Sequence, residues 1–298
     1  MTTKTNDRVT GVNARDRIAI IAGNGLLPIS VAAALKADGN PPFLLPLRGE
    51  AAAELYGYEH QEISTVDFGV LIKVLRQAGV RRVVLAGGVK NRPHLTDIKF
   101  NWPTLCAAAY MFGALGKGDD ALLRAFMRLL ERFGFSLVGA HEIVPHLLAP
   151  RPGTRLTLAV PDRQACEDIT LAKEAALRLG DLDIGQGAIA AGGRVIALEG
   201  AEGTDLMIER VVELRAAGRI PRRGGVLVKM AKPQQDERAD LPAIGVQTVE
   251  NAARAGLSGI AVEGQRSFIL GLAETIAKAN EKGLFITVVG RKAKDIVE

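Results

Sequence analysis

The stretch Val226–Gly245 (VLVKMAKPQQDERADLPAIG) combines the residue types that could bind an anionic group together with a metal ion. Its apolar start, bounded by glycines, predicts a buried strand. The polar loop that follows contains two prolines and the charged residues Lys229, Lys232, Asp236, Arg238 and Asp240. Cations mixed with carboxylates at the end of a buried strand suit a site for phosphate and a divalent cation. A solvated surface loop is the alternative that the same composition allows.

A second acidic cluster lies at a predicted junction between a strand and a helix, in the run Glu199-Gly200-Ala201-Glu202-Gly203-Thr204-Asp205. Thr204 or Asp205 could be the N-cap of the helix. A capped helix start does not explain Glu199 and Glu202, so this cluster is the second candidate for a metal site. Mg²⁺ binds a few carboxylates together with substrate phosphate oxygens, and such a cluster could supply the carboxylates.

Two glycine turns follow predicted strands in the first half of the chain. Gly23-Asn24-Gly25 separates a strand at 17–22 from a helix at 27–37, and Gly87-Gly88 follows a strand at 82–86. A helix N-terminus attracts phosphate, and open parallel sheets bind ligands at the carboxyl ends of their strands. We therefore expect the turns to bind the nucleotide or phosphate end of a ligand, with a purely structural role as the alternative.

The second glycine turn continues into Lys90 and Arg92, which could contact a phosphate or could be ordinary surface charges. The dinucleotide-binding fingerprint is incomplete, because Pro28 occupies the third glycine position and Arg48 stands where a ribose-binding acid is expected. The pattern therefore favours a mononucleotide or a sugar-nucleotide diphosphate over NAD.

Asp119 and Asp120 open a predicted helix at 121–132. The preceding GALGKG is not a phosphate-binding loop, because Gly118 stands where Ser or Thr must follow the lysine. Helix capping and the helix dipole need only one of the two acids. The other could contact a metal or the substrate.

The elements that would position these residues form two α/β domains with a cleft between them. We expect a disordered tail at 1–16, a Rossmann-like N-terminal domain at 17–148, a proline-rich linker at 149–161 and a C-terminal α/β catalytic domain at 162–298. The further predicted strands are 42–47, 136–139, 188–191, 194–199, 259–262 and 284–289, and the further predicted helices are 67–78, 102–115, 163–178, 206–217, 248–255 and 267–282.

The composition describes a soluble globular protein, with 298 residues, 48% hydrophobic and 24% charged. Only Cys106 and Cys166 are present and no CxxC occurs, which suits a reducing cytosol and excludes a cysteine-rich zinc site. We find no signal peptide and no apolar stretch of about 18–20 residues. Aromatic residues make up 4%, so base stacking on nucleic acid is disfavoured, while the net charge of +5 favours anionic partners.

The motifs IAGNGLLP, LAGGVKNRP, GKGDDALLR, GAHE, LDIGQGA, EGTD and KPQQDERADLPAIG follow one another between residues 17 and 290. Together they resemble the LpxI-type UDP-2,3-diacylglucosamine pyrophosphatases. The resemblance implies two domains with lipid bound between them. It also implies magnesium-dependent hydrolysis of UDP-2,3-diacylglucosamine to UMP and 2,3-diacylglucosamine 1-phosphate (lipid X), a step of lipid A biosynthesis in which water attacks the α-phosphorus. The aspartate of the family motif RxDLPxIG, which the family needs for activity, is Asp240 in this sequence.

With this resemblance added to the residue patterns, we expect Asp240, Arg238 and Lys232 to be catalytic. We expect Mg²⁺ to be the cofactor, bound by Asp240, Asp205 and Glu202. The expected substrate-binding residues are Gly23, Asn24, Gly25, Gly87, Gly88, Lys90, Arg92, Asp119, Asp120, Gln186 and Thr204.

The expected partner is the UDP-diacylglucosamine lipid and not a nucleic acid. A lipid substrate implies a cytoplasmic protein in transient contact with the cytoplasmic face of the inner membrane, and a homodimer stays open. The rival functions are a sugar-nucleotide transferase, which would use an acceptor hydroxyl in place of water, and a nucleotide–lipid binding module without catalysis.

Overall fold

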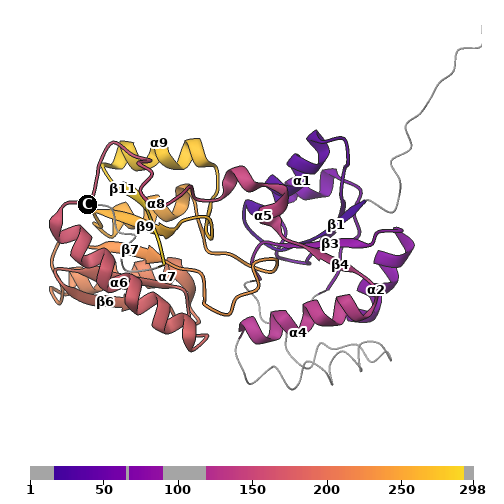
Figure 1. Cartoon of the computed structure of the whole chain (residues 1–298), viewed down its shortest axis with the longest axis horizontal. Coiled ribbons are helices and arrows are strands. Elements are labelled where there is room, and N and C mark those ends of the chain that lie inside the picture. Colours follow the sequence, from indigo (N-terminus) through magenta and orange to yellow (C-terminus); the bar gives the residue numbers. More distant parts are fainter. Residues whose placement is uncertain (1–16, 65–66, 90–118, 292–298) are drawn as a thin grey trace, which may run out of the picture. The chain divides into compact units, whose positions relative to one another are not determined.

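A computed structural model describes residues 17–64, 67–89 and 119–291 (Figure 1). The described chain divides into two compact units. The first contains the residues up to 89 together with Phe126–Ile143, and the second contains 119–125 and everything from Val144 onward. Helix α4 (Asp119–Arg132) therefore begins in the second unit and continues in the first.

The first unit is built on a four-stranded parallel sheet in the order β2-β1-β3-β4. The strands are β1 (Ile18–Ala22), β2 (Phe43–Pro46), β3 (Arg82–Ala86) and β4 (Ser136–Val138). The other elements of this unit are α1 (Leu27–Ala37), η1 (Ala53–Gly57), α2 (Phe68–Gln77), most of α4, and α5 (Ala140–Ile143). The first two strands are buried along their whole length, as expected for strands of a parallel sheet. The predicted Rossmann-like α/β fold of this half is confirmed.

The order in which successive strands join the sheet reverses at β1, since β2 lies on one side of β1 and β3 on the other. Such a switch point is where open α/β sheets bind ligands, at the carboxyl ends of the strands. Both glycine turns follow these two strands directly.

The second unit contains a five-stranded sheet in the order β11-β9-β7-β5-β6. The strands are β5 (Gly187–Ala191), β6 (Arg194–Leu198), β7 (Val226–Lys229), β9 (Gly259–Glu263) and β11 (Phe285–Val289). A parallel pair, β8 (Ala243–Ile244) and β10 (Phe268–Ile269), forms a separate small sheet. Strand β5 is antiparallel to both of its neighbours, β7 and β6. The predicted hairpin between β5 and β6 is confirmed, with positive φ at both Gly192 and Gly193.

The helices of the second unit are η3 (Pro145–Leu147), α6 (Arg163–Asp181), α7 (Gly203–Ala216), α8 (Val246–Arg254) and α9 (Leu272–Lys282). The two faces of the sheet have separate cores. Val226 and Val228 pack with apolar residues of α6, whereas Leu227 between them packs with residues of α7, α8 and α9. This alternation follows from the pleat of the strand, and both halves of the chain are α/β as predicted.

The predicted linker 149–161 is packed into the second unit. The Ala149 N–H donates to the Ser267 carbonyl and its own carbonyl accepts from Gln265, each at 2.8 Å. The Thr157 hydroxyl accepts from the Ile286 N–H at 3.0 Å. The Leu158 N–H donates to the Asn280 side chain at 2.7 Å, whereas the side chains of Thr154 and Arg155 bond to carbonyls of the stretch itself. The two compact units divide between Ile143 and Val144.

Two further predictions, the tail 1–16 and the helix 102–115, lie outside the described residues. Within the described part of the chain, none of the helices has both the length and the apolar character needed to cross a membrane.

Candidate active site

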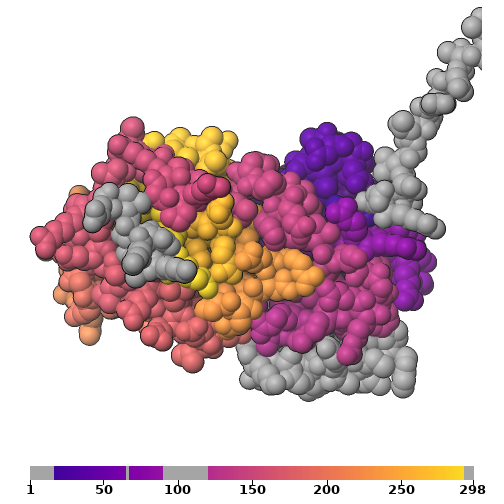
Figure 2. All heavy atoms as spheres, viewed as in Figure 1, coloured from indigo at the N-terminus to yellow at the C-terminus, as the bar shows by residue number. Residues whose placement is uncertain are grey.

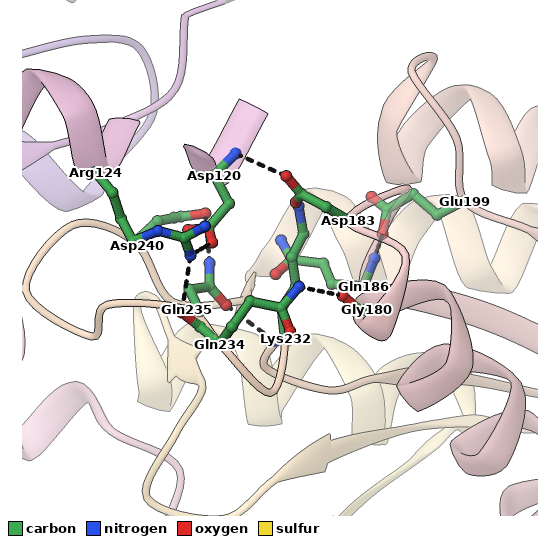
Figure 3. Close-up of polar contacts among 10 residues, drawn as sticks. All are labelled: Asp120, Arg124, Gly180, Asp183, Gln186, Glu199, Lys232, Gln234, Gln235 and Asp240. Carbon is green, nitrogen blue, oxygen red and sulfur yellow. Dashed lines mark hydrogen bonds and ion pairs between the residues drawn. The ribbon is translucent and has the colours of Figure 1, made fainter. Parts of the chain in front are cut away.

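Polar side chains of four chain segments gather at one edge of the second sheet. Lys229 ends β7 and Glu263 ends the parallel neighbour β9. Because β5 runs the opposite way, its first residue pairs with Lys229, which places Gln186 at the same edge. Strand β6 is antiparallel to β5, so Glu199 also emerges there. Figure 3 shows this edge together with the loop that follows β7.

Asp240 lies on that loop and has an exposed surface, although protein surrounds it. The Gln235 amide donates to its Oδ2 at 3.1 Å. Desolvation by the surrounding protein raises the pKa of the Asp240 carboxyl, against the positive charges of Lys229 and Lys232, while the negative charge of Glu199 adds to the increase. Asp240 is therefore open to solvent and lies within electrostatic range of two lysines and a second carboxylate. Orange atoms of the 230–245 region reach the molecular surface in Figure 2.

Lys232 is held at both ends. Its backbone N–H donates to the Gln235 side-chain carbonyl at 3.0 Å, and its ammonium forms an ion pair with Asp183. The side chains of Lys232 and Asp183 are only 12% and 10% exposed. Gln235, itself buried, thus joins the backbone of Lys232 to the carboxylate of Asp240. The ammonium of Lys229 is buried and donates to the Ala243 carbonyl at 3.1 Å.

Asp183 also accepts a hydrogen bond from the backbone N–H of Asp120, at 3.2 Å. It has a φ of +56°, a conformation that non-glycine residues adopt rarely and that Asp and Asn tolerate best. The Asp120 carboxylate pairs with Arg124, which donates to the Gln234 carbonyl at 2.9 Å (Figure 3). The other oxygen of Asp120 is buried and has no hydrogen-bond partner among the described residues.

The structure assigns Asp120 to the first turn of α4, where Asp183 accepts its N–H. The alternative of a metal or substrate contact for Asp120 stays open, with the unpartnered oxygen as the atom that could make it. Asp119 is the first residue of α4.

Glu199 organises two of the predicted substrate-binding residues. Its carboxylate accepts the Gln186 N–H at 3.1 Å and the Thr204 hydroxyl at 2.6 Å, and the residue is buried. A Cβ on Gly185 would lie 2.3 Å from the Glu199 carbonyl oxygen, so the glycine permits this close approach. Glu199 was predicted only as a member of the acidic cluster that could bind a metal; in the structure both of its carboxylate oxygens accept hydrogen bonds from protein groups. The glycines of the Gly-Gln-Gly run were the signal that another backbone approaches closely here.

The start of α7 differs from the prediction. Its N-cap is Glu202, without a side-chain cap bond, so neither Thr204 nor Asp205 caps the helix. Thr204 instead donates to Glu199, and Asp205 accepts from Asn251 at 2.9 Å. The carboxylate of Asp205 thus bonds to a side chain of α8 instead of capping its own helix.

The predicted magnesium ligands are not assembled into one set. The Glu202 carboxylate forms an ion pair with Arg210 at 3.0 Å, and Asp205 is bound to Asn251. Across residues 17–64, 67–89 and 119–291, no group of three His, Cys, Asp or Glu residues is arranged to hold a metal. Asp240 is the predicted ligand that keeps an exposed surface beside the lysines.

Arg238 is engaged within its own loop. Its guanidinium donates to the two carboxylate oxygens of Asp236 at 3.0 and 2.7 Å. These hydrogen bonds hold the pKa of Asp236 below its ordinary value, with the nearby charge of Arg124 as a smaller cause. The positive charge of Arg238 is therefore balanced locally.

The two glycine turns of the first unit contact each other directly. Asn24 and Gly88 exchange backbone hydrogen bonds of 2.8 and 3.2 Å, and the Gly23 N–H donates to the Ala86 carbonyl at 2.9 Å. The Asn24 side chain donates to Glu50 at 3.1 Å. The structure thus brings the turns together at the switch point, but these three N–H groups are already paired and cannot cradle a phosphate. Lys90 and Arg92 lie outside the described residues.

Comparisons with known proteins agree with this two-part organisation. Residues 17–147 match the sequence model of the LpxI N-terminal domain, and residues 152–287 match that of the LpxI C-terminal domain. The chain is 40% identical over 272 residues to the UDP-2,3-diacylglucosamine pyrophosphatase LpxI of Caulobacter vibrioides, covering 91% of this chain and 96% of that protein.

Among solved structures, the precorrin-6A reductase CobK is 12% identical, covers 95% of this chain and 90% of its own, and has a TM-score of 0.31. The two domain models and the extent of the Caulobacter match settle the family: the chain belongs to the LpxI family.

Proposed function

We propose that this protein hydrolyses UDP-2,3-diacylglucosamine to UMP and 2,3-diacylglucosamine 1-phosphate in lipid A biosynthesis, with magnesium and by attack of water at the α-phosphorus. The observation that carries the substrate assignment is the 40% identity to a UDP-2,3-diacylglucosamine pyrophosphatase over almost the whole of both chains. The described site supports the type of chemistry, because it sets Asp240 close to two lysines at a sheet edge.

The charges of the site suit a phosphoanhydride. The diphosphate of the substrate carries two negative charges, and more negative charge builds on the transferring phosphoryl group in the transition state. Lys229 and Lys232 would stabilise that charge, and both are fixed by hydrogen bonds before the substrate arrives. Asp240 would orient the attacking water and accept its proton, since it is the acid of the group that is exposed as a residue.

The residues present fit a magnesium ion that takes most of its ligands from substrate and water. Mg²⁺ is usually held by one or two carboxylates plus substrate phosphates. Asp240 would supply a carboxylate, whereas Glu199 is occupied by Gln186 and Thr204. The bound ion would polarise the phosphoryl oxygens and neutralise charge on them.

We further propose that the protein works in the cytoplasm and contacts the cytoplasmic face of the membrane transiently. The support is chemical, because the proposed substrate carries two acyl chains.

The direct test is to incubate the purified protein with UDP-2,3-diacylglucosamine in ¹⁸O-labelled water, with and without magnesium. We expect UMP and lipid X only with magnesium, and the heavy oxygen in UMP. Heavy oxygen in lipid X would move the attack to the β-phosphorus. Transfer of the nucleotide or the sugar phosphate to an added acceptor would indicate a transferase, and binding without products would indicate a non-catalytic module.

A further inference from the structure

Glu263 is a deeply buried carboxylate that the proposed reaction does not use. It ends β9 and is 2% exposed. Its Oε2 accepts the backbone N–H of Ala231 at 2.9 Å. Arg291 donates to both of its oxygens, at 2.8 and 3.0 Å, and the Arg266 guanidinium lies 3.6 Å away.

Arg291 also binds Ala231, at the carbonyl group of that residue. Its Nη2 donates to the Ala231 carbonyl oxygen at 2.5 Å. The N–H of Ala231 is therefore bound by Glu263 while its C=O is bound by Arg291, and the two side chains are bonded to each other. We call Glu263 and Arg291 the Ala231 clamp.

The clamp lies two residues past the end of β7, where the sheet no longer controls the backbone. The next residue is Lys232, whose N–H bonds to Gln235, and the Gln235 amide bonds to Asp240. The clamp is thus connected through the Ala231–Lys232 peptide unit and two hydrogen bonds to the carboxylate proposed to orient water. A rotation of the Ala231 peptide would move both the lysine and the glutamine.

The energetic cost of burying the Glu263–Arg291 ion pair indicates that the pair serves to position the loop more than to stabilise the fold. Burying an ion pair costs desolvation energy that its attraction barely repays, so apolar residues of similar size often stabilise a protein as well or better. Catalytic groups, in contrast, must be held within about 0.5 Å of the productive geometry, and a shift of about 1 Å can lower the rate about 100-fold.

We propose that Glu263 and Arg291 are positioning residues for the reaction, which act by fixing the Ala231 peptide and through it Lys232, Gln235 and Asp240. This inference rests on the proposed function for the identity of the reaction, but not for the effect on the loop.

The test uses Glu263→Gln and Arg291→Lys in the full-length protein. Glu263→Gln removes the negative charge of Glu263. Arg291→Lys removes the planar guanidinium that donates to the Ala231 carbonyl. Glu209→Gln is the matched control, since it breaks an exposed ion pair with Arg254 in the same unit, away from the loop. Each variant is assayed well below its unfolding temperature, and rates are divided by the folded fraction from circular dichroism.

We expect kcat per folded molecule to fall about 10- to 100-fold in both clamp variants, with KM changed less than about threefold. In hydrogen exchange followed by NMR, the Ala231 amide should exchange at least about tenfold faster, while the amides of Val226–Val228 and the whole control variant stay as in the wild type. Arg291→Lys should also lose most of its effect on kcat in a Gln235→Ala background, because residues acting through one series of contacts are not additive.

Unchanged kcat in folded Arg291→Lys, or an unchanged Ala231 amide, would overturn the proposal. If Glu263→Gln does not fold, Arg291→Lys decides, because the side chain of Arg291 is 32% exposed and tolerates change better. If the wild type does not hydrolyse UDP-2,3-diacylglucosamine, the proposed function fails while hydrogen exchange still tests the clamp.

Discussion

Each unit has a loop at the carboxyl end of a strand, and the two units hold that loop by different kinds of contact. In the first unit the turns after β1 and β3 are joined by hydrogen bonds between backbone groups, and glycines let them approach. In the second unit the loop after β7 is held by side chains: Glu263 and Arg291 bind the Ala231 peptide, Asp183 binds Lys232, and Gln235 connects to Asp240.

The difference in contacts gives the first unit a turn structure built from backbone and the second unit a loop that carries charged side chains. Backbone-to-backbone bonds join the turns of the first region and occupy the N–H groups of Gly23, Asn24 and Gly88. Side-chain anchors in the second region leave Asp240 exposed beside two lysines. We therefore expect variants of the second region to lose rate and variants of the first region to lose stability.

The largest effect should follow Asp240→Asn. Loss of one electrostatic or positioning group at a phosphoryl site is expected to lower kcat roughly 100-fold or more. Stability should not fall. The pKa of Asp240 is raised by desolvation, so the folded protein binds the proton more tightly than the unfolded chain, and stability is lost as the pH rises through that raised pKa. Asparagine removes that loss, so the unfolding temperature at pH 7 should stay equal or rise.

The measurements for Asp240→Asn are turnover and thermal unfolding at pH 7 and at pH 3. Glu250→Gln, which changes a partly exposed carboxylate on α8, is the control and should keep both properties. Turnover like that of the wild type in Asp240→Asn would place the reacting centre elsewhere.

The next largest effect should come from Asp183, whose backbone and charge can be tested separately. Asp183→Asn keeps a residue that tolerates the left-handed conformation but removes the charge that holds Lys232. Asp183→Gly suits the backbone and removes the side chain altogether. If the ion pair matters, both variants should lose about 10-fold in kcat per folded molecule. Both should also unfold at a lower temperature, because the side chains of Lys232 and Asp183 are only 12% and 10% exposed and removing one partner leaves the other charge unpaired. If Asp183→Asn keeps the wild-type kcat and Asp183→Gly does not, a hydrogen bond without charge is enough to position Lys232.

The sequence predicted more of the fold than of the site. Helix 27–37 and strand 82–86 have the predicted bounds, because apolar periodicity and glycine punctuation are local signals. The hairpin was likewise predictable from Gly192-Gly193. The packing of residues 149–161 on the second unit was not predictable, because prolines do not tell whether a stretch of chain contacts a neighbour.

The site shows the same limit. The loop with Lys232 and Asp240 was identified by residue type, and the structure places both side chains within electrostatic range of each other. The roles of Glu199 and Glu263 depend on which strands are neighbours and on the reversed direction of β5, which no local pattern gives. The carboxylates Glu202 and Asp205 are close in sequence, but Glu202 pairs with Arg210 of its own helix and Asp205 bonds to Asn251 of α8.

In the first unit, Gly23→Ala should reduce stability and Gly88→Ala should not. A Cβ on Gly23 would lie 2.2 Å from the Gly88 carbonyl oxygen, a contact with backbone that cannot move away easily. A Cβ on Gly88 would meet the Asn24 side chain at an ordinary 3.5 Å. Denaturant unfolding should show a loss of more than about 2 kcal/mol for the first variant and less than about 0.5 kcal/mol for the second.

The variants Gly23→Ala and Gly88→Ala also test whether the Gly87-Gly88 turn binds a ligand. If the Gly88 turn contacts the nucleotide, Gly88→Ala should raise KM in a protein of normal stability. Unchanged KM would leave this turn with a structural role alone.

The smallest effect should come from the Asp236–Arg238 pair, which is partly exposed. The pKa of Asp236 is lowered in the folded state, so the pair stabilises the protein above the ordinary pKa of 3.8 and this stabilisation is lost as the pH falls through the lowered pKa. Partly exposed pairs contribute at most about 1 kcal/mol, and salt screens them. Unfolding midpoints of wild type and Asp236→Asn should therefore differ slightly at pH 7 and converge as the pH falls below the lowered pKa of Asp236. They should also converge at pH 7 in 1 M salt. A difference that persists at low pH would assign the effect of Asp236 to its hydrogen bond with the Arg238 backbone, 3.1 Å long, and the loop would then share the backbone-based stability of the first unit.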